Sequence, residues 1–228
     1  MKTSLFAAVS LIGISVFSGG ALAADPFVDP GVDWSGFYAG VQLGYQWGDD
    51  HTEEFITATG LPSGFDQDFD PEGVVGGIHA GYNFQTGSIV WGIEADLEAS
   101  DFDGGYTLAN GNGTDFDSNW QGSVRARVGL PVGSALIYAT GGLAVAELEY
   151  AYFTPVLSED FSSTEVGWTA GGGAEWMFNP SWTTRIEYRY TDYGNISNNS
   201  TVAFPGFTYE HDPSIHSVRL GVSYLFGN

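Results

Sequence analysis

Arginines and acids recur at regular positions in the chain. The first chemistry that they suggest is the formation of ion pairs with one another. Apart from Lys2, every lysine or arginine side chain is an arginine, and each stands in a stretch where apolar or aromatic residues recur with a period of two. Acids occupy the same kind of position in further stretches. The five arginines and five acids are Arg125, Arg127, Arg185, Arg189, Arg219, Glu94, Asp96, Glu98, Glu175 and Glu187. Because successive side chains of a strand point to opposite faces, these charges lie opposite the apolar face and predict a network of ion pairs.

The sequence offers few residues in patterns that would serve catalysis or metal binding. It has no cysteine, which removes thiol nucleophiles and zinc thiolates together. The four histidines lack the spacing of zinc ligands; they are His51, His79, His211 and His216. A haem or metal role for His51 and His211 stays open as an alternative. So does a lipid-modifying hydrolase that uses Ser214 and His216. We expect no enzymatic activity and no cofactor or bound metal.

The elements that must position these charges are strands with one apolar and one small or polar face. They cover residues 34–47, 74–84, 89–98, 120–130, 135–149, 166–178, 182–190 and 215–226. Only 135–149 is apolar on both faces, so its facing stays open, and a bulge near Gly141 and Gly142 could switch it. A chain with its large apolar side chains on one face and balanced charges on the other is inside out relative to a soluble protein. A β-barrel in a lipid bilayer requires this arrangement.

The links between the strands alternate strictly in length. Three are short, at 85–88, 131–134 and 179–181. Four are long and polar, at 48–73, 99–119, 150–165 and 191–214. The sequence therefore predicts an all-β fold: an eight-stranded antiparallel up-and-down transmembrane β-barrel with four long extracellular loops and three short periplasmic turns.

The long links hold much of the negative charge. The first two contain Asp49, Asp50, Glu53, Glu54, Asp66, Asp68, Asp70, Glu72, Asp101, Asp103, Asp115 and Asp117. With 28 acids and a net charge of −22, the chain repels phosphate backbones, and we exclude nucleic acid as a partner. Asp66, Asp68 and Asp70 resemble half of a calcium loop, but Pro71 stands where that loop needs glycine. We expect a solvated surface, with divalent cations bridging the acidic loops to anionic lipid headgroups as the alternative.

The N-terminal residues are typical of an export signal. Lys2 supplies the positive end, residues 5–17 the apolar stretch and residues 21–23 the small-residue cleavage pattern. We expect a signal peptide over 1–23 that is cleaved after Ala23, a short periplasmic segment over 24–33, and the barrel over 34–228.

Both ends of the expected barrel resemble a known family. The opening Asp33-Trp34-Ser35-Gly36-Phe37-Tyr38-Ala39-Gly40 and the ending Ser217-Val218-Arg219-Leu220-Gly221-Val222-Ser223-Tyr224-Leu225-Phe226 are similar to the porin-family outer-membrane β-barrel proteins, the opacity-like and immunogenic proteins of Gram-negative bacteria. The ending also resembles the assembly signal of such barrels, through Arg219, Gly221, Tyr224 and Phe226. The resemblance implies the cell outer membrane as location. It also implies membrane lipids, including lipopolysaccharide, and the barrel-assembly machinery as partners.

The expected function follows from the lumen. Eight strands leave an interior that side chains can fill, so we expect a closed, charge-paired barrel that serves the cell envelope as a structural and surface protein. The first alternative is a small passive porin for hydrophilic solutes, and a less favoured one is a haem- or cation-binding surface protein. A third is a soluble ligand-binding barrel with an apolar interior, in which tryptophans such as Trp91 and Trp176 would be buried.

Overall fold

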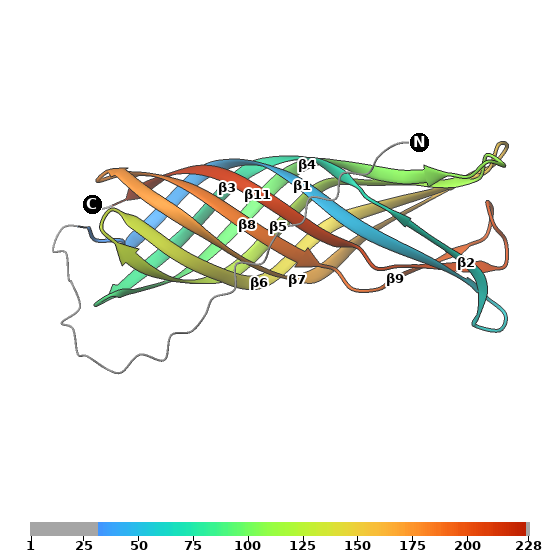
Figure 1. Ribbon diagram of the computed structural model, residues 1–228, viewed down its shortest axis with the longest axis horizontal. Coiled ribbons are helices and arrows are strands. Elements are labelled where there is room, and N and C mark those ends of the chain that lie inside the picture. The colour runs from blue at the N-terminus through green and yellow to red at the C-terminus, as the bar shows by residue number, and fades with distance from the viewer. Residues whose placement is uncertain (1–31, 227–228) are drawn as a thin grey trace, which may run out of the picture.

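The computed structural model describes residues 32–226 as one antiparallel sheet that closes on itself (Figure 1). The ring consists of β1 (Gly36–Ile56), β3 (Glu72–Thr86), β4 (Ile89–Thr107), β5 (Gly113–Val132), β6 (Ala135–Phe153), β7 (Ser158–Asn179), β8 (Trp182–Asp192) and β11 (Ser214–Phe226). Each strand pairs with the next in this order, and β11 closes the ring against β1 from Phe37↔Phe226 to Asp49↔Ser214. This is the predicted eight-stranded up-and-down barrel. Across residues 32–226, no helix is long and apolar enough to cross a membrane. The expected signal peptide and residues 24–31 lie outside the described residues.

The outer wall of the barrel is apolar and its interior is charged. Trp91 and Trp176 expose 52% and 55% of their surface, whereas Arg125 and Arg219 expose 1% and 2%. A soluble ligand-binding barrel would have the opposite distribution, so that alternative is wrong. On β1 the apolar band runs from Phe37 to Trp47; at about 3.3 Å per residue and a tilt of about 40°, it is roughly 25 Å tall, as an outer-membrane barrel needs.

Beyond the apolar band, most of the expected long loops continue as strands. β1, β4, β5, β6 and β7 extend well past it, and three further strands appear: β2 (Leu61–Phe69), β9 (Ile196–Ser200) and β10 (Phe207–His211). Both β2 and β10 pair with the outer end of β1. The links shrink to short segments such as 57–60, 108–112 and 154–157. Figure 1 shows these hairpins projecting at the end opposite the short turns.

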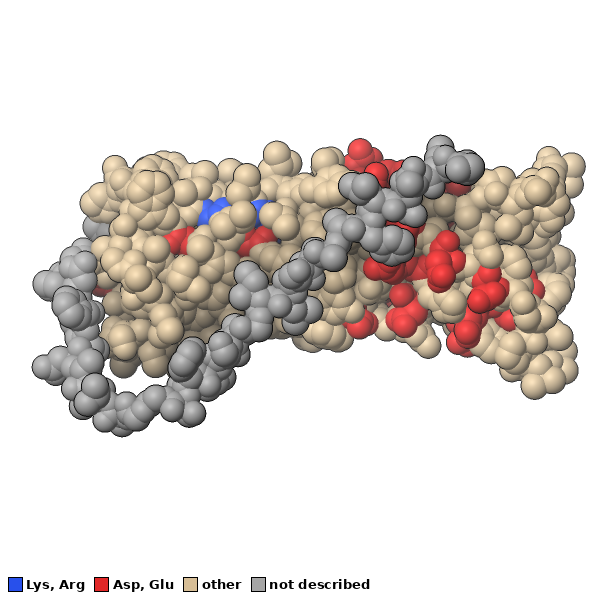
Figure 2. Space-filling model, viewed as in Figure 1, with Lys and Arg blue, Asp and Glu red and all other residues tan. Residues whose placement is uncertain are grey.

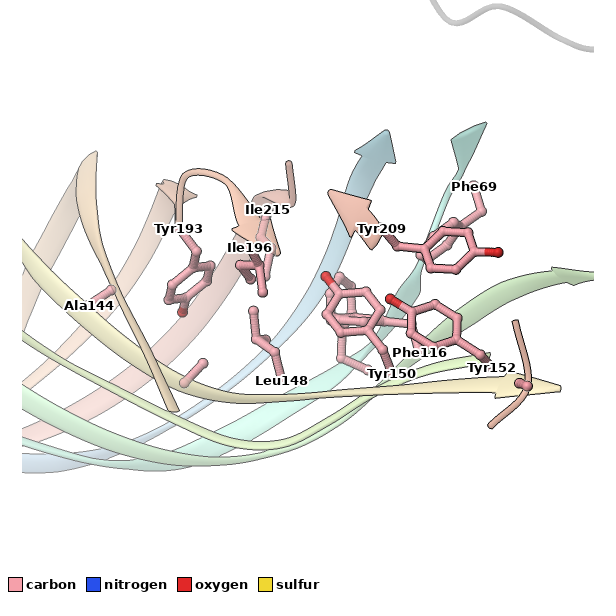
Figure 3. Packing of buried hydrophobic residues seen from close by; sticks show 13 residues of the cluster. Phe69, Phe116, Ala144, Leu148, Tyr150, Tyr152, Tyr193, Ile196, Tyr209 and Ile215 are labelled. Carbon is pink, nitrogen blue, oxygen red and sulfur yellow. The ribbon is translucent and has the colours of Figure 1, made fainter. Parts of the chain in front are cut away.

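An aromatic cluster explains why the extensions are ordered. It fills the outer part of the barrel and consists of Phe69, Phe102, Phe116, Ala144, Ala146, Leu148, Tyr150, Tyr152, Tyr193, Ile196, Ala203, Tyr209 and Ile215 (Figure 3). In sequence several of these residues, such as Phe102 and Phe116, stand between exposed acids, so the segments look polar overall although one face is buried. The number of polar residues therefore suggested loops where the alternation continues.

The fifth strand of the ring, β6, keeps one facing along its whole length. Leu136, Tyr138 and Leu148 are buried inside, whereas Ile137 and Leu143 are exposed on the outer wall. No bulge switches the facing at Gly141 and Gly142, which pair regularly with β5 and β7. Both faces are apolar because β6 also lines the two apolar ends of the interior, where it contributes to separate buried clusters.

Candidate functional site in the barrel lumen

The register between β4 and β5 sets the first ion pairs. Glu94 lies directly opposite Arg125, so the strand alternation turns both side chains into the lumen. Arg125 Nη2 is 2.5 Å from Glu94 Oε1 and 3.1 Å from Asp96 Oδ2. Its Nη1 is 2.7 Å from Glu187 Oε1, which belongs to β8. Arg125 therefore connects two walls of the barrel.

The remaining arginines extend the network along the lumen. Arg189 Nη2 is 2.8 Å from Glu187 Oε1, and Arg219 donates to both carboxylate oxygens of Glu98 at 2.9 Å. Arg185 pairs with Glu94, which already accepts from Arg125. Arg189 also lies 3.3 Å from Asp96 and 3.9 Å from Glu98, and the second contact joins the Arg219–Glu98 pair to the others, so eight of the ten sequence-selected charges form one connected network.

Arg127 and Glu175 form a separate pair that joins the network through a tyrosine. Arg127 Nη1 donates to Tyr38 Oη at 3.3 Å, and Tyr38 donates to Glu94 at 2.7 Å. The Arg127 guanidinium also lies over the ring of Tyr138, 3.9 Å from its centre, in a cation–π contact. The structure thus brings all ten charges into contact with an opposite charge, and none of them exposes more than 8% of its surface.

Neutral polar side chains donate further hydrogen bonds to these carboxylates. Tyr138 donates to Glu187 at 3.0 Å, Thr183 to Glu175 at 2.6 Å and Ser123 to Asp96 at 2.6 Å. Gln42 and Gln121 both donate to Glu98. Tyr138 and Thr183 were not selected from the sequence. The β6 alternation would have identified Tyr138 if the facing of that strand had been fixed.

Glycines on the wall make room for the large lumen side chains. A Cβ atom on Gly81 would lie 2.4 Å from Tyr38 Oη, and one on Gly44 would lie 2.8 Å from Arg219 Cγ. Gly173 stands in the same relation to the ring of Tyr138. The abundance of glycine in the strands therefore serves the packing of the interior, where large and small residues face each other.

The two ends of the lumen are closed by apolar side chains. At the end of the short turns, Trp34 packs with Val90, Leu136 and Tyr138. At the other end, the aromatic cluster encloses His211, which the sequence suggested as a loop residue. His211 stacks on Tyr150 with ring centres 4.0 Å apart and contacts Tyr152 Oη at 2.6 Å.

Asp50 shares this buried position, although the preceding residue, Asp49, is exposed. It accepts a hydrogen bond from Tyr150 at 2.8 Å and lies 3.3 Å from His211 Nδ1. Burial, reinforced by the charge of Asp50, raises the pKa of Tyr150 well above its usual value, so Tyr150 remains a hydrogen-bond donor. These contacts join β1, β6 and β10 and serve packing. Nowhere in residues 32–226 do three or more histidines and acids converge as metal ligands.

The other histidines are apart from one another. His51 is exposed beside Asp68, His79 contacts Ser223 in the lumen, and His216 stacks against Trp47 on the outer wall. The pairing of Ser214 and His216 with a carboxylate, which a hydrolase would need, is not present among their described contacts.

The acids outside the lumen gather beyond the apolar band. Figure 2 shows most of the red side chains over the half of the visible face toward the hairpin tips, while in the other half a small area shows blue with some red beside it. One row crosses four neighbouring strands, with Glu72 opposite Asp103, Asp103 opposite Asp117 and Asp117 opposite Glu149. Burial, followed by the charges of Asp103, Asp115 and Asp101, raises the pKa of Asp117. Like charges in directly opposite positions repel one another.

Comparison with known proteins agrees with a β-barrel whose outer wall is apolar and whose interior is charged. Residues 6–226 match the family described as outer membrane protein beta-barrel domain. The chain belongs to this family. A 22 kDa outer membrane protein of Rhizobium leguminosarum bv. viciae is 35% identical over 199 residues, which cover 87% of this chain and 81% of the relative. A 31 kDa outer-membrane immunogenic protein of Brucella melitensis biotype 1 is 31% identical over 258 residues, which cover 99% of this chain and 100% of the relative.

A solved structure has the same fold. The outer membrane protein OprG from Pseudomonas aeruginosa matches with a TM-score of 0.53 over 85% of this chain and 97% of its own, at 12% identity. At this identity the likeness concerns the fold alone. The family match and the relatives place this family member in the outer membrane, in contact with membrane lipid, as the resemblance implied.

The last strand of this outer-membrane barrel contains the residues that resemble an assembly signal. Arg219 points into the lumen, whereas Tyr224 and Phe226 face outward in the aromatic band near the short turns. Phe226 lies 5.3 Å from the ring of Phe37, and Tyr224 lies 5.2 Å from that of Trp182. The aromatic residues thus contact the first strand and the preceding strand at the seam that closes the ring.

Proposed function

We propose that this protein is a closed structural barrel that stabilises the outer membrane and presents an acidic surface to the outside. The observation that carries the proposal is the burial of all ten lumen charges, none of which exposes more than 8% of its surface. Arg125 and Arg127 are among the largest side chains with less than 2% exposure, and so are Trp34 and Tyr150 at the two ends. A water-filled channel would expose such groups. Removing one partner of a buried pair costs about 3 to 5 kcal/mol, so the network also favours a single register.

Conductance in planar bilayers tests this proposal. We expect the refolded wild-type protein to be silent, whereas a passive porin would give steady, reproducible openings, and such openings would overturn the closed barrel. A double variant, Arg125→Ser with Glu187→Ser, provides the control because it removes the contact between β5 and β8 across the lumen. Heat-dependent gel mobility establishes that both proteins are folded, and openings of the double variant show that an inserted barrel can be detected.

We further propose that divalent cations connect the acidic surface to lipopolysaccharide. This proposal is supported by the row formed by Glu72, Asp103, Asp117 and Glu149. The row lies next to the outer end of the apolar band, because Glu72 pairs in register with Trp47 and accepts a hydrogen bond from Tyr45 at 2.7 Å. All five arginines are buried in the lumen, so within residues 32–226 neither lysine nor arginine offers a direct contact to lipid phosphates on the surface.

The cation contact can be measured with lipopolysaccharide bilayers. We expect calcium or magnesium to slow the lateral diffusion of the wild-type protein, and Asp103→Asn with Asp117→Asn to abolish the effect. Asp66→Asn with Asp68→Asn is the matched control, because it removes the same charge from β2, outside the row. Equal cation effects in both double variants would contradict a specific role of the row. The immunogenic name of the Brucella relative supports surface presentation, which antibody binding to intact cells would test.

A further inference from the structure

A cavity of about 200 Å³ lies among the hairpin tips, at the edge of the aromatic cluster. Three parts of the chain that are distant in sequence line it: the β1–β2 hairpin, the β4–β5 hairpin and the segment around β10. The lining side chains used below are Glu54, Phe65, Tyr106, Phe204 and Tyr209. The cavity is open to the outside and separate from the lumen charge network.

Aromatic rings form its walls. The rings of Phe65 and Tyr106 are 6.3 Å apart and tilted, and those of Phe204 and Tyr209 are 5.8 Å apart, edge to face. Phe65, Tyr106 and Phe204 are half-buried, so each presents part of its surface to the cavity. Rings that converge from several sides offer negative π faces to a cation between them.

Glu54 supplies a formal negative charge at the same cavity. Its Oε2 atom accepts a hydrogen bond from Tyr209 Oη at 2.6 Å, which holds the half-buried carboxylate in place. Burial, together with the hydrogen bond to Glu54, raises the pKa of Tyr209, so the phenol stays protonated and continues to donate. Every arginine is engaged in the lumen, and none is paired with Glu54.

We propose that this cavity binds a small organic cation of the alkylated ammonium class, such as choline. Its aromatic walls suit the methyl groups and the charge of a quaternary ammonium, and Glu54 balances that charge. The volume is below the usual range of about 300 to 1,000 Å³ for drug-sized ligands, which favours a headgroup-sized ion. The acidic outer surface raises the local concentration of cations around the cavity. This assignment is independent of whether the lumen conducts.

The chemistry is tested by a matched pair of ligands. The refolded full-length protein, in a maltoside detergent without choline groups, is titrated with choline and with its uncharged carbon isostere, 3,3-dimethyl-1-butanol. We expect saturable binding of choline and binding of the isostere that is about tenfold weaker or undetectable. Equal affinities would overturn the proposal, because the cavity would then select by shape and apolar contact alone. Glucose serves as an uncharged, polar comparison ligand. Binding of glucose without binding of choline would also overturn the proposal.

Variants distinguish the cavity from the acidic surface in general. Tyr106→Leu removes a ring and is expected to weaken choline binding about tenfold, whereas Tyr106→Phe keeps the ring and leaves the affinity within about twofold. Glu54→Gln is expected to weaken binding, and Asp66→Asn, which neutralises an exposed acid outside the lining, is not. If Asp66→Asn has the same effect as Glu54→Gln, nonspecific attraction explains the binding and the site is refuted.

Two kinds of lipid vesicle show whether the site takes a free cation or a lipid headgroup. Free choline is compared with phosphatidylcholine vesicles, using phosphatidylglycerol vesicles as the reference. Free choline is expected to compete with a lipid headgroup only if both reach the same cavity. Retained binding of choline with no vesicle binding assigns the site to soluble amines, whereas vesicle binding that is lost in Tyr106→Leu assigns it to lipid headgroups. Failure of choline and of both vesicle types to bind would refute the proposal.

Discussion

The guanidinium of Arg125 and the carboxylate of Glu187 meet 2.7 Å apart across the lumen, although they come from β5 and β8, which are not neighbours in the ring. The same guanidinium contacts Glu94 on the adjacent strand. Hydrogen bonds between neighbouring strands hold the wall together, and this contact joins distant parts of the wall through the interior. Loss of Arg125 therefore disturbs three carboxylates at once.

Arg125→Leu is expected to destabilise the barrel by about 3 to 5 kcal/mol, because it leaves Glu94, Asp96 and Glu187 without a shared buried counter-charge. Urea unfolding in detergent, followed by heat-dependent gel mobility, measures the change. Val128→Leu, on the outer wall of the same strand, controls for the substitution itself and is expected to unfold like the wild type. An unchanged midpoint for Arg125→Leu would show that the network contributes little to stability.

The barrel and its facing are predictable from the sequence because one rule governs both surfaces. In a bilayer, the alternation of large apolar and small or polar residues must persist in every spanning strand, so it can be read locally. Glu94 and Arg125 stand in such stretches, and the structure places them in register. The pairing between β5 and β8 cannot be read this way, since Arg125 and Glu187 meet only after the ring has closed.

The outer half of the barrel was less accessible to sequence reasoning. Phe102 and Phe116 belong to the buried cluster, but exposed aspartates surround them in sequence, and the stretch therefore suggested a polar loop. Asp50 and His211 are a similar case: Asp50 continues the inward-facing positions of Gln42 and Gln46 on β1, but the polar stretch that follows Trp47 suggested a loop. Its contacts with Tyr150 and His211 show that the strand continues there.

Gly81→Ala is expected to destabilise the barrel by about 1 to 3 kcal/mol, because the new Cβ would meet Tyr38 Oη in a filled interior. Displacement of Tyr38 would also weaken its hydrogen bond to Glu94. Gly141→Ala is the matched control, since a Cβ there meets only Thr169 O, at 3.8 Å. Parallel thermal unfolding of both variants tests the idea, and equal shifts would show that the space over Gly81 is not needed.

Phe226→Ala is expected to slow membrane assembly several-fold while leaving the stability of the finished barrel nearly unchanged, if this residue belongs to the signal that the assembly machinery recognises. Phe84→Ala removes an aromatic side chain of similar exposure, 58% against 49%, from β3, away from the last strand. Assembly into proteoliposomes that contain the machinery, followed by gel mobility, compares the two. Equal delays would assign the effect to loss of aromatic contact with lipid.

Glu159 controls the segment that precedes β10, and its effect depends on pH. The carboxylate accepts hydrogen bonds from Ser200, Thr201 and the backbone N–H of Val202. Burial opposes the charge, but these bonds prevail and lower the pKa of Glu159 from 4.5 to about 2. Because the folded-state pKa is depressed, the stabilisation is present above about pH 4.5 and is lost as the pH falls toward 2. We expect pepsin to leave residues 200–206 intact at pH 4 and to cut them near pH 2.

Substitution separates this local effect from general acid unfolding. Glu159→Gln is expected to be cut at both pH values, because the amide keeps the shape but loses the charge that holds the backbone N–H groups. Asp160→Asn removes the neighbouring exposed acid and is expected to behave like the wild type. Mass spectrometry of the fragments locates the cut, and gel mobility reports whether the barrel persists. Cleavage of Glu159→Gln only at pH 2 would show that the carboxylate does not order this segment.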